Sequence, residues 1–238
     1  MNILLLFPSN MLSEDIAEIS GRQLKHVESV LEAKIGDSVN IGLVDGALGS
    51  GKITVIEKDK IKLQIHWHSQ PPPALPVTLI IGLPRPKMLK RILQTISTMG
   101  VKDLYFIHSW KVEKSFWQSP WLNDDKILDN CVLGLEQAKD TMLPNIHLRK
   151  RFKPFVEDEL PTISNGSRKL LAHPNEDNDC PLGTDNTKTT LVIGPEGGFT
   201  TYEVDKIKSL GFEGINLGPR ILRVETAVPV LLAKLFKH

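Results

Sequence analysis

The sequence predicts an α/β protein with a small β-barrel-like module first and a larger, mostly parallel sheet after it. Three observations lead to this prediction. Four prolines in residues 71–76 divide the chain, because proline prevents helix formation and favours extended backbone. Before them, short segments alternate in polarity as half-buried strands do. After them, apolar runs alternate with amphipathic helical segments, as in parallel α/β sheets.

The prolines set the predicted domains, which are residues 1–70, a linker at 71–76, and residues 77–238. A proline-rich ligand for another protein is the alternative interpretation of the linker. A chain of 238 residues is long enough for two modest domains. Its 41% hydrophobic and 24% charged residues exclude a disordered chain and a dedicated membrane protein.

Charge is unevenly distributed, although the net charge is only +1. Residues 1–70 carry 7 basic and 9 acidic side chains, residues 71–155 carry 13 and 7, and residues 156–238 carry 9 and 12. The basic clusters of the middle third either form solvated faces or bind a polyanion. They include Arg85, Lys87, Lys90, Arg91 and the run Arg149-Lys150-Arg151.

Cys131 and Cys180 lie far apart without metal-ligand spacing, which indicates a reduced protein with no structural metal. The apolar run at residues 3–7 ends at Pro8 and is too short for a signal peptide or a membrane span. We therefore expect a first strand there, a cytoplasmic location and no membrane partner.

In the first module, residues 23–31 have the apolar spacing of a helix, and strands are expected at 38–44, 51–56 and 60–67. Such a module either binds RNA or serves as a scaffold. The second module is expected to contain strands at 77–82, 104–108, 169–173 and 190–194 and helices at 88–99 and 121–141.

Ligands of parallel α/β sheets bind beyond the carboxyl ends of the strands, so Gly82, His173 and Gly194 are expected on one rim. The most distinctive segment is IGPEGGFT at 193–200. Its glycines let a ligand approach backbone donors, although an ordinary strand-to-helix turn is the alternative. It matches neither GxGxxG nor GK[ST], which disfavours a dinucleotide or nucleoside triphosphate.

A second segment, LGPRILRVETA at 217–227, follows another short strand. Its Arg220 and Arg223 either form surface ion pairs or recognise an anion or a base. Together with LAHP at 171–174, the two segments closely resemble the ribosomal RNA small-subunit methyltransferase E family of the SPOUT superfamily. The resemblance extends more weakly over nearly the whole chain, for example at Glu136-Gln137.

This resemblance implies a PUA-like RNA-binding β-barrel at 1–70 and a SPOUT methyltransferase domain at 77–238 whose end forms a trefoil knot. It also implies a homodimer, a ribosomal RNA substrate and S-adenosyl-L-methionine as cofactor. Carried over residue by residue, the cofactor site comprises Leu171, His173, Ile193, Gly194, Pro195, Glu196, Gly197, Leu217, Gly218, Arg220, Ile221, Leu222, Thr226 and Ala227.

The family methylates N3 of a uridine in 16S ribosomal RNA. Loss of the N3 proton leaves negative charge that an arginine stabilises, and we expect Arg223 in this role. Glu225 and Glu196 are the candidate proton acceptors, although capping a helix or orienting an arginine is the favoured interpretation of both carboxylates.

The part expected to hold RNA departs from the family, since Glu28 and Glu32 stand where basic residues are usual. The alternatives are therefore a related enzyme with another RNA target, or a cofactor- or RNA-binding module without the activity. A nucleotide-dependent oxidoreductase or kinase is suggested by the glycine loop alone. The candidate contacts to RNA phosphates are Arg85, Lys87, Arg91 and Lys111.

Overall fold

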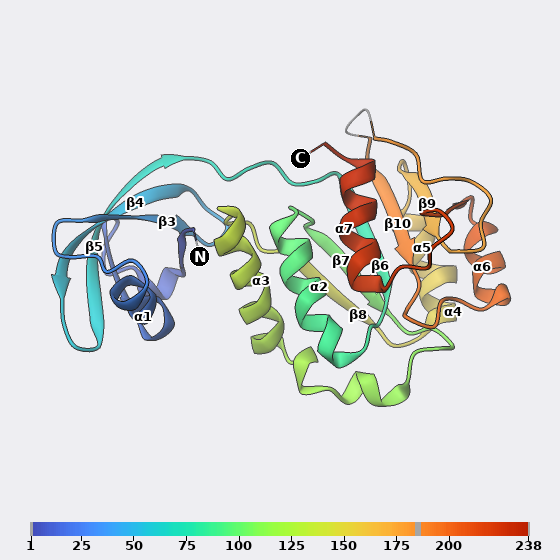
Figure 1. Cartoon of the computed structure of the whole chain (residues 1–238), viewed down its shortest axis with the longest axis horizontal. Coiled ribbons are helices and arrows are strands. Elements are labelled where there is room, and N and C mark those ends of the chain that lie inside the picture. Colours follow the sequence, from blue (N-terminus) through green and yellow to red (C-terminus); the bar gives the residue numbers. More distant parts are fainter. Residues whose placement is uncertain (1, 184–186, 238) are drawn as a thin grey trace. The chain divides into compact units, whose positions relative to one another are not determined.

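The computed structural model describes residues 2–183 and 187–237 and divides into two compact units (Figure 1). Unit 1 extends to Pro73 and also includes Val132–Leu143, whereas unit 2 comprises Ala74–Cys131 and the chain from Pro144 onward. The first division falls inside the predicted linker. The segment Val132–Leu143, which the sequence assigns to the second module, belongs by its contacts to unit 1.

Unit 1 is built on a mixed five-stranded sheet with the order β1-β3-β4-β5-β2. β1 pairs parallel with β3, and the other pairs are antiparallel. The predicted strands and helix are present, with β4 beginning at Leu48 rather than Gly51. The elements are β1 (Leu4–Leu6), β2 (Ile16–Ser20), α1 (Gly21–Ser29), β3 (Ser38–Leu43), β4 (Leu48–Ile56) and β5 (Lys60–Ser69).

The apolar run at the start of the chain is explained by burial on both faces of β1. Leu4 and Leu6 join the core that includes side chains of α1 and the other strands. Ile3 and Leu5 belong to a separate cluster with Val132 and Leu135. Because successive strand residues point to opposite faces, a strand covered on both sides needs apolar residues throughout.

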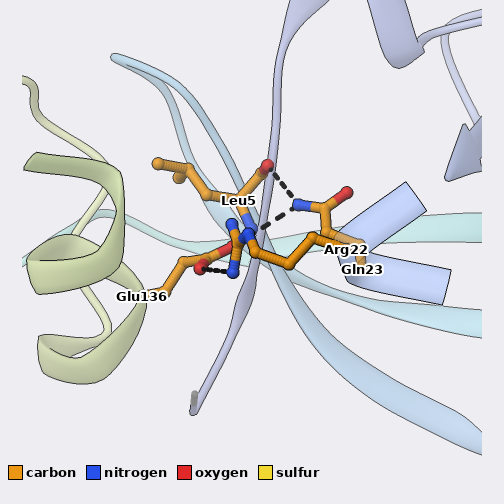
Figure 2. Close-up of polar contacts among 4 residues, drawn as sticks. All are labelled: Leu5, Arg22, Gln23 and Glu136. Atoms are coloured by element: carbon orange, nitrogen blue, oxygen red, sulfur yellow. Dashed lines mark hydrogen bonds and ion pairs between the residues drawn. The ribbon is translucent and has the colours of Figure 1, made fainter. Parts of the chain in front are cut away.

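Glu136 connects β1 and α1 to the segment Val132–Leu143 (Figure 2). Its side chain is fully buried, and Arg22 Nη1 lies 2.7 Å from its Oε2. The backbone N–H of Leu5 donates to Oε1 at 3.3 Å, and Gln23 Nε2 donates to the Leu5 carbonyl at 2.8 Å. The carboxylate therefore satisfies a buried strand N–H and an arginine together.

Replacing Glu136 with alanine should destabilise unit 1 by about 1–3 kcal/mol, because the N–H of Leu5 then lacks its acceptor. Faster hydrogen exchange at β1 and β3 amides measures this effect. Glu57→Ala is the matched control, since Glu57 is 48% exposed and its Oε2 lies 3.9 Å from Lys60 Nζ. Equal exchange rates in the two variants would contradict a structural role for Glu136.

Unit 2 contains a fully parallel six-stranded sheet with the order β11-β9-β10-β6-β7-β8. The strands are β6 (Val77–Gly82), β7 (Asp103–Ile107), β8 (Asn145–Arg149), β9 (Arg168–Ala172), β10 (Thr189–Ile193) and β11 (Glu213–Ile215). The main helices of unit 2 are α2 (Pro86–Thr98), α6 (Thr201–Lys208) and α7 (Val224–Leu235). The helix α3 (Asp124–Ala138) is shared, since its residues up to Cys131 belong to unit 2 and those from Val132 onward belong to unit 1. Parallel pairing confirms the predicted α/β class.

Two elements differ from the sequence prediction. β8 was not predicted, because it is an edge strand of half-buried residues without a clear apolar pattern. The helix expected at 121–141 begins only at Asp124, since Pro120–Leu122 forms a 3-10 turn in which Ser119 Oγ accepts from the Trp121 N–H. Within the described ranges, no helix has the length and apolar character needed to span a bilayer.

Candidate functional site

The carboxyl ends of four parallel strands meet at one edge of the unit 2 sheet. Ile193 of β10 is in register with Ala172 of β9 and Ile81 of β6, and Ile215 of β11 is also in register with Ala172. The residues that follow these strands therefore lie along one rim. This is where ligands of open parallel sheets bind.

A cavity at this rim is lined by three loops and the start of α7. The loops follow β9, β10 and β11, which lie beside one another in the sheet. Eleven of the predicted cofactor residues line it: His173, Ile193, Gly194, Pro195, Glu196, Leu217, Gly218, Arg220, Ile221, Leu222 and Ala227.

The remaining lining residues were not predicted individually. Most are apolar, and periodicity alone marks them as core positions. Asn216 is the polar member, and its Oδ1 accepts from the Gly218 N–H at 2.7 Å. Gly218 has φ +94°, which favours glycine, so this turn shapes the loop after β11. The set comprises Ala172, Pro174, Gly198, Ile215, Asn216, Val224 and Leu231.

The loop after β10 is held tightly at both ends. Gly198, with φ +69°, donates its N–H to the Pro195 carbonyl at 2.7 Å and so closes a turn. On Gly82, a Cβ would lie only 2.6 Å from the backbone nitrogen of Pro195. Thr200 and Glu203 form a capping box at the start of α6.

His173 lines the cavity, and the pKa of its imidazole is lowered. Burial lowers its pKa below the ordinary 6.5, the nearby Lys111 charge lowers it further, and Glu176 opposes this. The N–H of Asn175 donates to its Nδ1 at 3.3 Å, so the ring proton lies on Nε2. Because that proton is bonded to the Phe199 backbone, the ring contributes a largely apolar face to the cavity.

We expect the imidazole of His173 to titrate below pH 6.5 in an NMR experiment. Lys111→Met should raise this pKa, because it removes a neighbouring positive charge. The folded chain takes up this proton less readily than the unfolded chain, so protonation of His173 favours unfolding. The fold therefore becomes less stable as the pH falls through 6.5. A pKa at or above 6.5 would contradict the placement of His173.

Three predicted cofactor residues lie outside the cavity lining. Leu171 is fully buried in β9 and contributes to the core. Gly197 packs against Lys111, whose Nζ donates to the Gly197 carbonyl at 2.8 Å. Thr226 is exposed in the first turn of α7. These residues support the cavity or flank it.

The two candidate catalytic residues separate in the structure. Arg223 is the N-cap of α7 and is exposed, and its neighbours Leu222 and Val224 both line the cavity. Glu225 instead lines a different hollow with Arg91 and other residues of α2. Its Oε2 is buried without a hydrogen-bond partner among the described residues.

Glu196, the other candidate proton acceptor, lines the cavity and also the adjoining groove around Lys111 and Lys208. Its Oε1 accepts from the backbone N–H of Arg85, directly before α2. The carboxylate therefore binds the backbone directly before α2. Its Oε2 is the oxygen that can accept a hydrogen bond from a further group.

The candidate RNA contacts Arg85, Lys87, Arg91 and Lys111 are all exposed. Arg85 and Lys87 follow the carboxyl end of β6, and Lys111 follows that of β7. These three therefore lie toward the rim that carries the cavity, whereas Arg91 faces the hollow with Glu225. Positive charge next to the cavity is suited to a phosphate backbone.

The cavity suits a flat ligand with a polar edge. Its walls are mainly apolar side chains and glycine backbone, and its charged members are Glu196 and Arg220. Backbone N–H and C=O groups suit the edge of a purine, and the neutral His173 avoids repelling a cation. An S-adenosylmethionine molecule fits this donor set better than a nucleoside triphosphate does.

Comparisons with known proteins agree with this chemistry. Residues 71–236 match a protein family whose description is RNA methyltransferase domain. The ribosomal RNA small subunit methyltransferase E of Treponema pallidum is 28% identical over 233 residues, covering 95% of this chain and 87% of the relative. The protein of the same name from Bacillus subtilis is 26% identical over 223 residues, covering 88% and 85%.

Two solved structures are similar along the whole chain. One is a ribosomal RNA small subunit methyltransferase E from Neisseria gonorrhoeae bound to S-adenosyl methionine, with a TM-score of 0.75, 21% identity and coverage of 97% and 95%. The other is a putative methyltransferase from Legionella pneumophila in complex with the same cofactor, with a TM-score of 0.75, 20% identity and coverage of 98% and 96%.

Proposed function

The chain belongs to the RNA methyltransferase domain family, and from this premise we propose that it methylates N3 of a uridine in 16S ribosomal RNA, with S-adenosylmethionine as methyl donor. One observation carries the proposal. The cavity lies within residues 71–236, which match the family. It is built by the loops that follow the adjacent strands β9, β10 and β11. The relatives named above supply the expected cofactor and RNA.

The cofactor, when bound, supplies a methyl group on a cationic sulfonium. The chain's own part is to hold and orient it. The loop after β10 offers backbone groups at Gly194 and Gly198, and the loop after β11 offers them at Leu217 and Gly218. His173 contributes a neutral ring. Positioning of two reactants contributes roughly 7–11 kcal/mol at best, so this alignment is the main catalytic term.

Arg223 is the proposed catalytic residue for the acceptor base. Loss of the N3 proton places negative charge on the ring nitrogen and the flanking carbonyl oxygens. The exposed guanidinium of Arg223, whose neighbours Leu222 and Val224 line the cavity, would stabilise that charge. Among the proton acceptors, geometry favours Glu196, which lines the cavity, over Glu225, which lines another hollow.

The proposal also covers the assembly of the chain. The curled sheet of unit 1 supports a PUA-like RNA-binding module. A trefoil knot is supported by bonds that link residues 176–183 to Asn216 and to α7. A homodimer is proposed from the resemblance to the family. The enzyme would act on ribosomal RNA in the cytoplasm, and Arg85, Lys87, Arg91 and Lys111 would hold the RNA phosphates.

Calorimetry with purified protein tests the cofactor assignment. We expect one site for S-adenosylmethionine and no measurable binding of ATP or NAD. Gly194→Val should abolish binding, because a Cβ on Gly194 already lies 3.1 Å from the Phe199 nitrogen and a larger side chain also enters the cavity. Binding of ATP or NAD in preference to S-adenosylmethionine would instead support the nucleotide-dependent alternative.

A further inference from the structure

A second pocket lies beside the cofactor loop and is not explained by the proposed cofactor site. It has a volume of about 440 Å³, within the range of roughly 300–1,000 Å³ typical of small-ligand sites. It lies between the chain after β7, the helical segment that begins at Phe152, and the start of α6. Its main lining side chains are His108, Ser109, Trp110, Phe152, Lys153 and Tyr202.

The aromatic side chains of this pocket are open to solvent. Trp110 is 83% exposed and Tyr202 is 59% exposed, so neither contributes much to the core. Phe152 is half-buried, and its ring lies 6.2 Å from that of Phe199 in the cofactor loop. Exposed aromatic faces around one apolar pocket form a stacking platform for a planar ligand.

His108 gives the pocket a hydrogen-bonding group. Trp117 Nε1 donates to His108 Nδ1 at 3.0 Å, which leaves the ring proton on Nε2. Nε2 can therefore donate to the acceptor edge of a nucleobase. Ser109 also belongs to the lining, but its fully buried Oγ is out of reach of a ligand.

The charges around the pocket indicate a polyanionic ligand. Lys150 and Arg151 are exposed and directly precede Phe152, and Lys153 is exposed on the pocket wall. Arg149 contributes less, because its Nε is paired with Glu159 at 2.6 Å. Base stacking on aromatic rings beside Lys and Arg is how proteins hold unpaired RNA.

Trp110 is fixed relative to the cofactor loop by the buried carboxylate of Glu203. Oε1 accepts from the Trp110 N–H at 2.7 Å, and Oε2 accepts from the N–H of Thr200 at 2.9 Å and its Oγ1 at 3.0 Å. Lys111, the next residue, donates to the Gly197 carbonyl. These bonds fix the backbone of Trp110 beside the cofactor loop, so a ligand stacked on its exposed indole lies next to that loop.

We propose that this pocket binds one unpaired nucleobase of the RNA substrate, stacked on Trp110 and hydrogen-bonded to His108. The inference rests on the proposed RNA methyltransferase function and names a substrate-positioning site within it. The basic run after β8 holds the adjacent phosphates. Binding of this base sets the position of the target uridine at the cavity.

The test measures the affinity of labelled short single-stranded RNA for the full chain by fluorescence anisotropy. Trp110→Ala should weaken binding about 5- to 150-fold, which corresponds to roughly 1–3 kcal/mol for one stacked base. Trp110→Phe should retain most of the affinity. Trp121→Ala is the matched control, since Trp121 is 38% exposed in unit 2 and lies outside the pocket.

A second probe separates base stacking from charge. RNA of the same length with abasic sites should bind the wild type and Trp110→Ala equally, and calorimetry should give the same S-adenosylmethionine affinity for both. The proposal is overturned if the wild type does not bind base-containing RNA, or if Trp110→Ala binds it as tightly as Trp121→Ala does. It is also overturned if Trp110→Ala weakens the binding of abasic RNA as much as that of base-containing RNA. It is equally overturned if Trp110→Ala impairs only methylation of assembled subunits, which would indicate a protein occupant. The anisotropy assay measures RNA affinity without catalytic turnover. Absence of methyltransferase activity would therefore leave its result unchanged and would be detected in a separate assay.

Discussion

Replacing Arg223 with alanine is expected to lower kcat about 10²–10³-fold, the usual effect of removing one group that stabilises transition-state charge. The affinity for S-adenosylmethionine should change little, since Arg223 does not line the cavity while its neighbours Leu222 and Val224 do. The fold should persist because the exposed side chain is lost while the Arg223 carbonyl still accepts from Thr226 and Ala227 at the start of α7. Single-turnover methylation of RNA measures the effect.

Arg168→Ala is the control for this variant. Arg168 begins β9 and therefore lies at the amino end of the sheet, away from the rim of the cavity. Arg223→Lys should restore part of the rate, because it retains charge without the planar donor fork. A kcat of Arg223→Ala within a few fold of wild type would remove Arg223 from the proposed mechanism.

Gly82→Ala is expected to weaken S-adenosylmethionine binding about 5- to 150-fold, since overpacking costs roughly 1–3 kcal/mol. The added Cβ would lie 2.6 Å from the backbone nitrogen of Pro195. Backbone cannot move aside as a flexible side chain can, so the loop that lines the cavity must shift. Calorimetry of the cofactor measures the loss.

Gly197→Ala tests whether the effect is specific to that contact. Its Cβ would meet methylene carbons of Lys111 at 3.1 Å, which are part of a flexible side chain. We expect a much smaller loss of cofactor affinity for this variant. Equal affinities for Gly82→Ala and wild type would show that the loop does not depend on its packing against β6.

Local signals in the sequence predicted much of the site. The capping pair Thr200 and Glu203 marks the start of α6, and the glycines after β10 mark a close approach of backbone to a ligand. Strand and helix alternation predicts the parallel sheet, and parallel order then places all the carboxyl ends at one edge. These features depend on neighbours within a few residues.

Other features depend on contacts between distant segments, which sequence patterns do not show. The burial of β1 on both faces results from Val132 and Leu135, far along the chain. Glu225 follows the cavity-lining residue Val224 in the sequence but lines a different hollow beside α2. Helix geometry points successive side chains in different directions. The pocket at Trp110 combines three segments and has no sequence motif of its own.

The most direct test of the account uses small ribosomal subunits from a strain that lacks this gene. They are incubated with the purified protein and methyl-labelled S-adenosylmethionine, and nucleosides of the RNA are analysed by mass spectrometry. We expect label in 3-methyluridine at one position of 16S ribosomal RNA, and much less label when the Arg223→Ala protein is used. Absence of label from the RNA, or label in a different nucleoside, would contradict it.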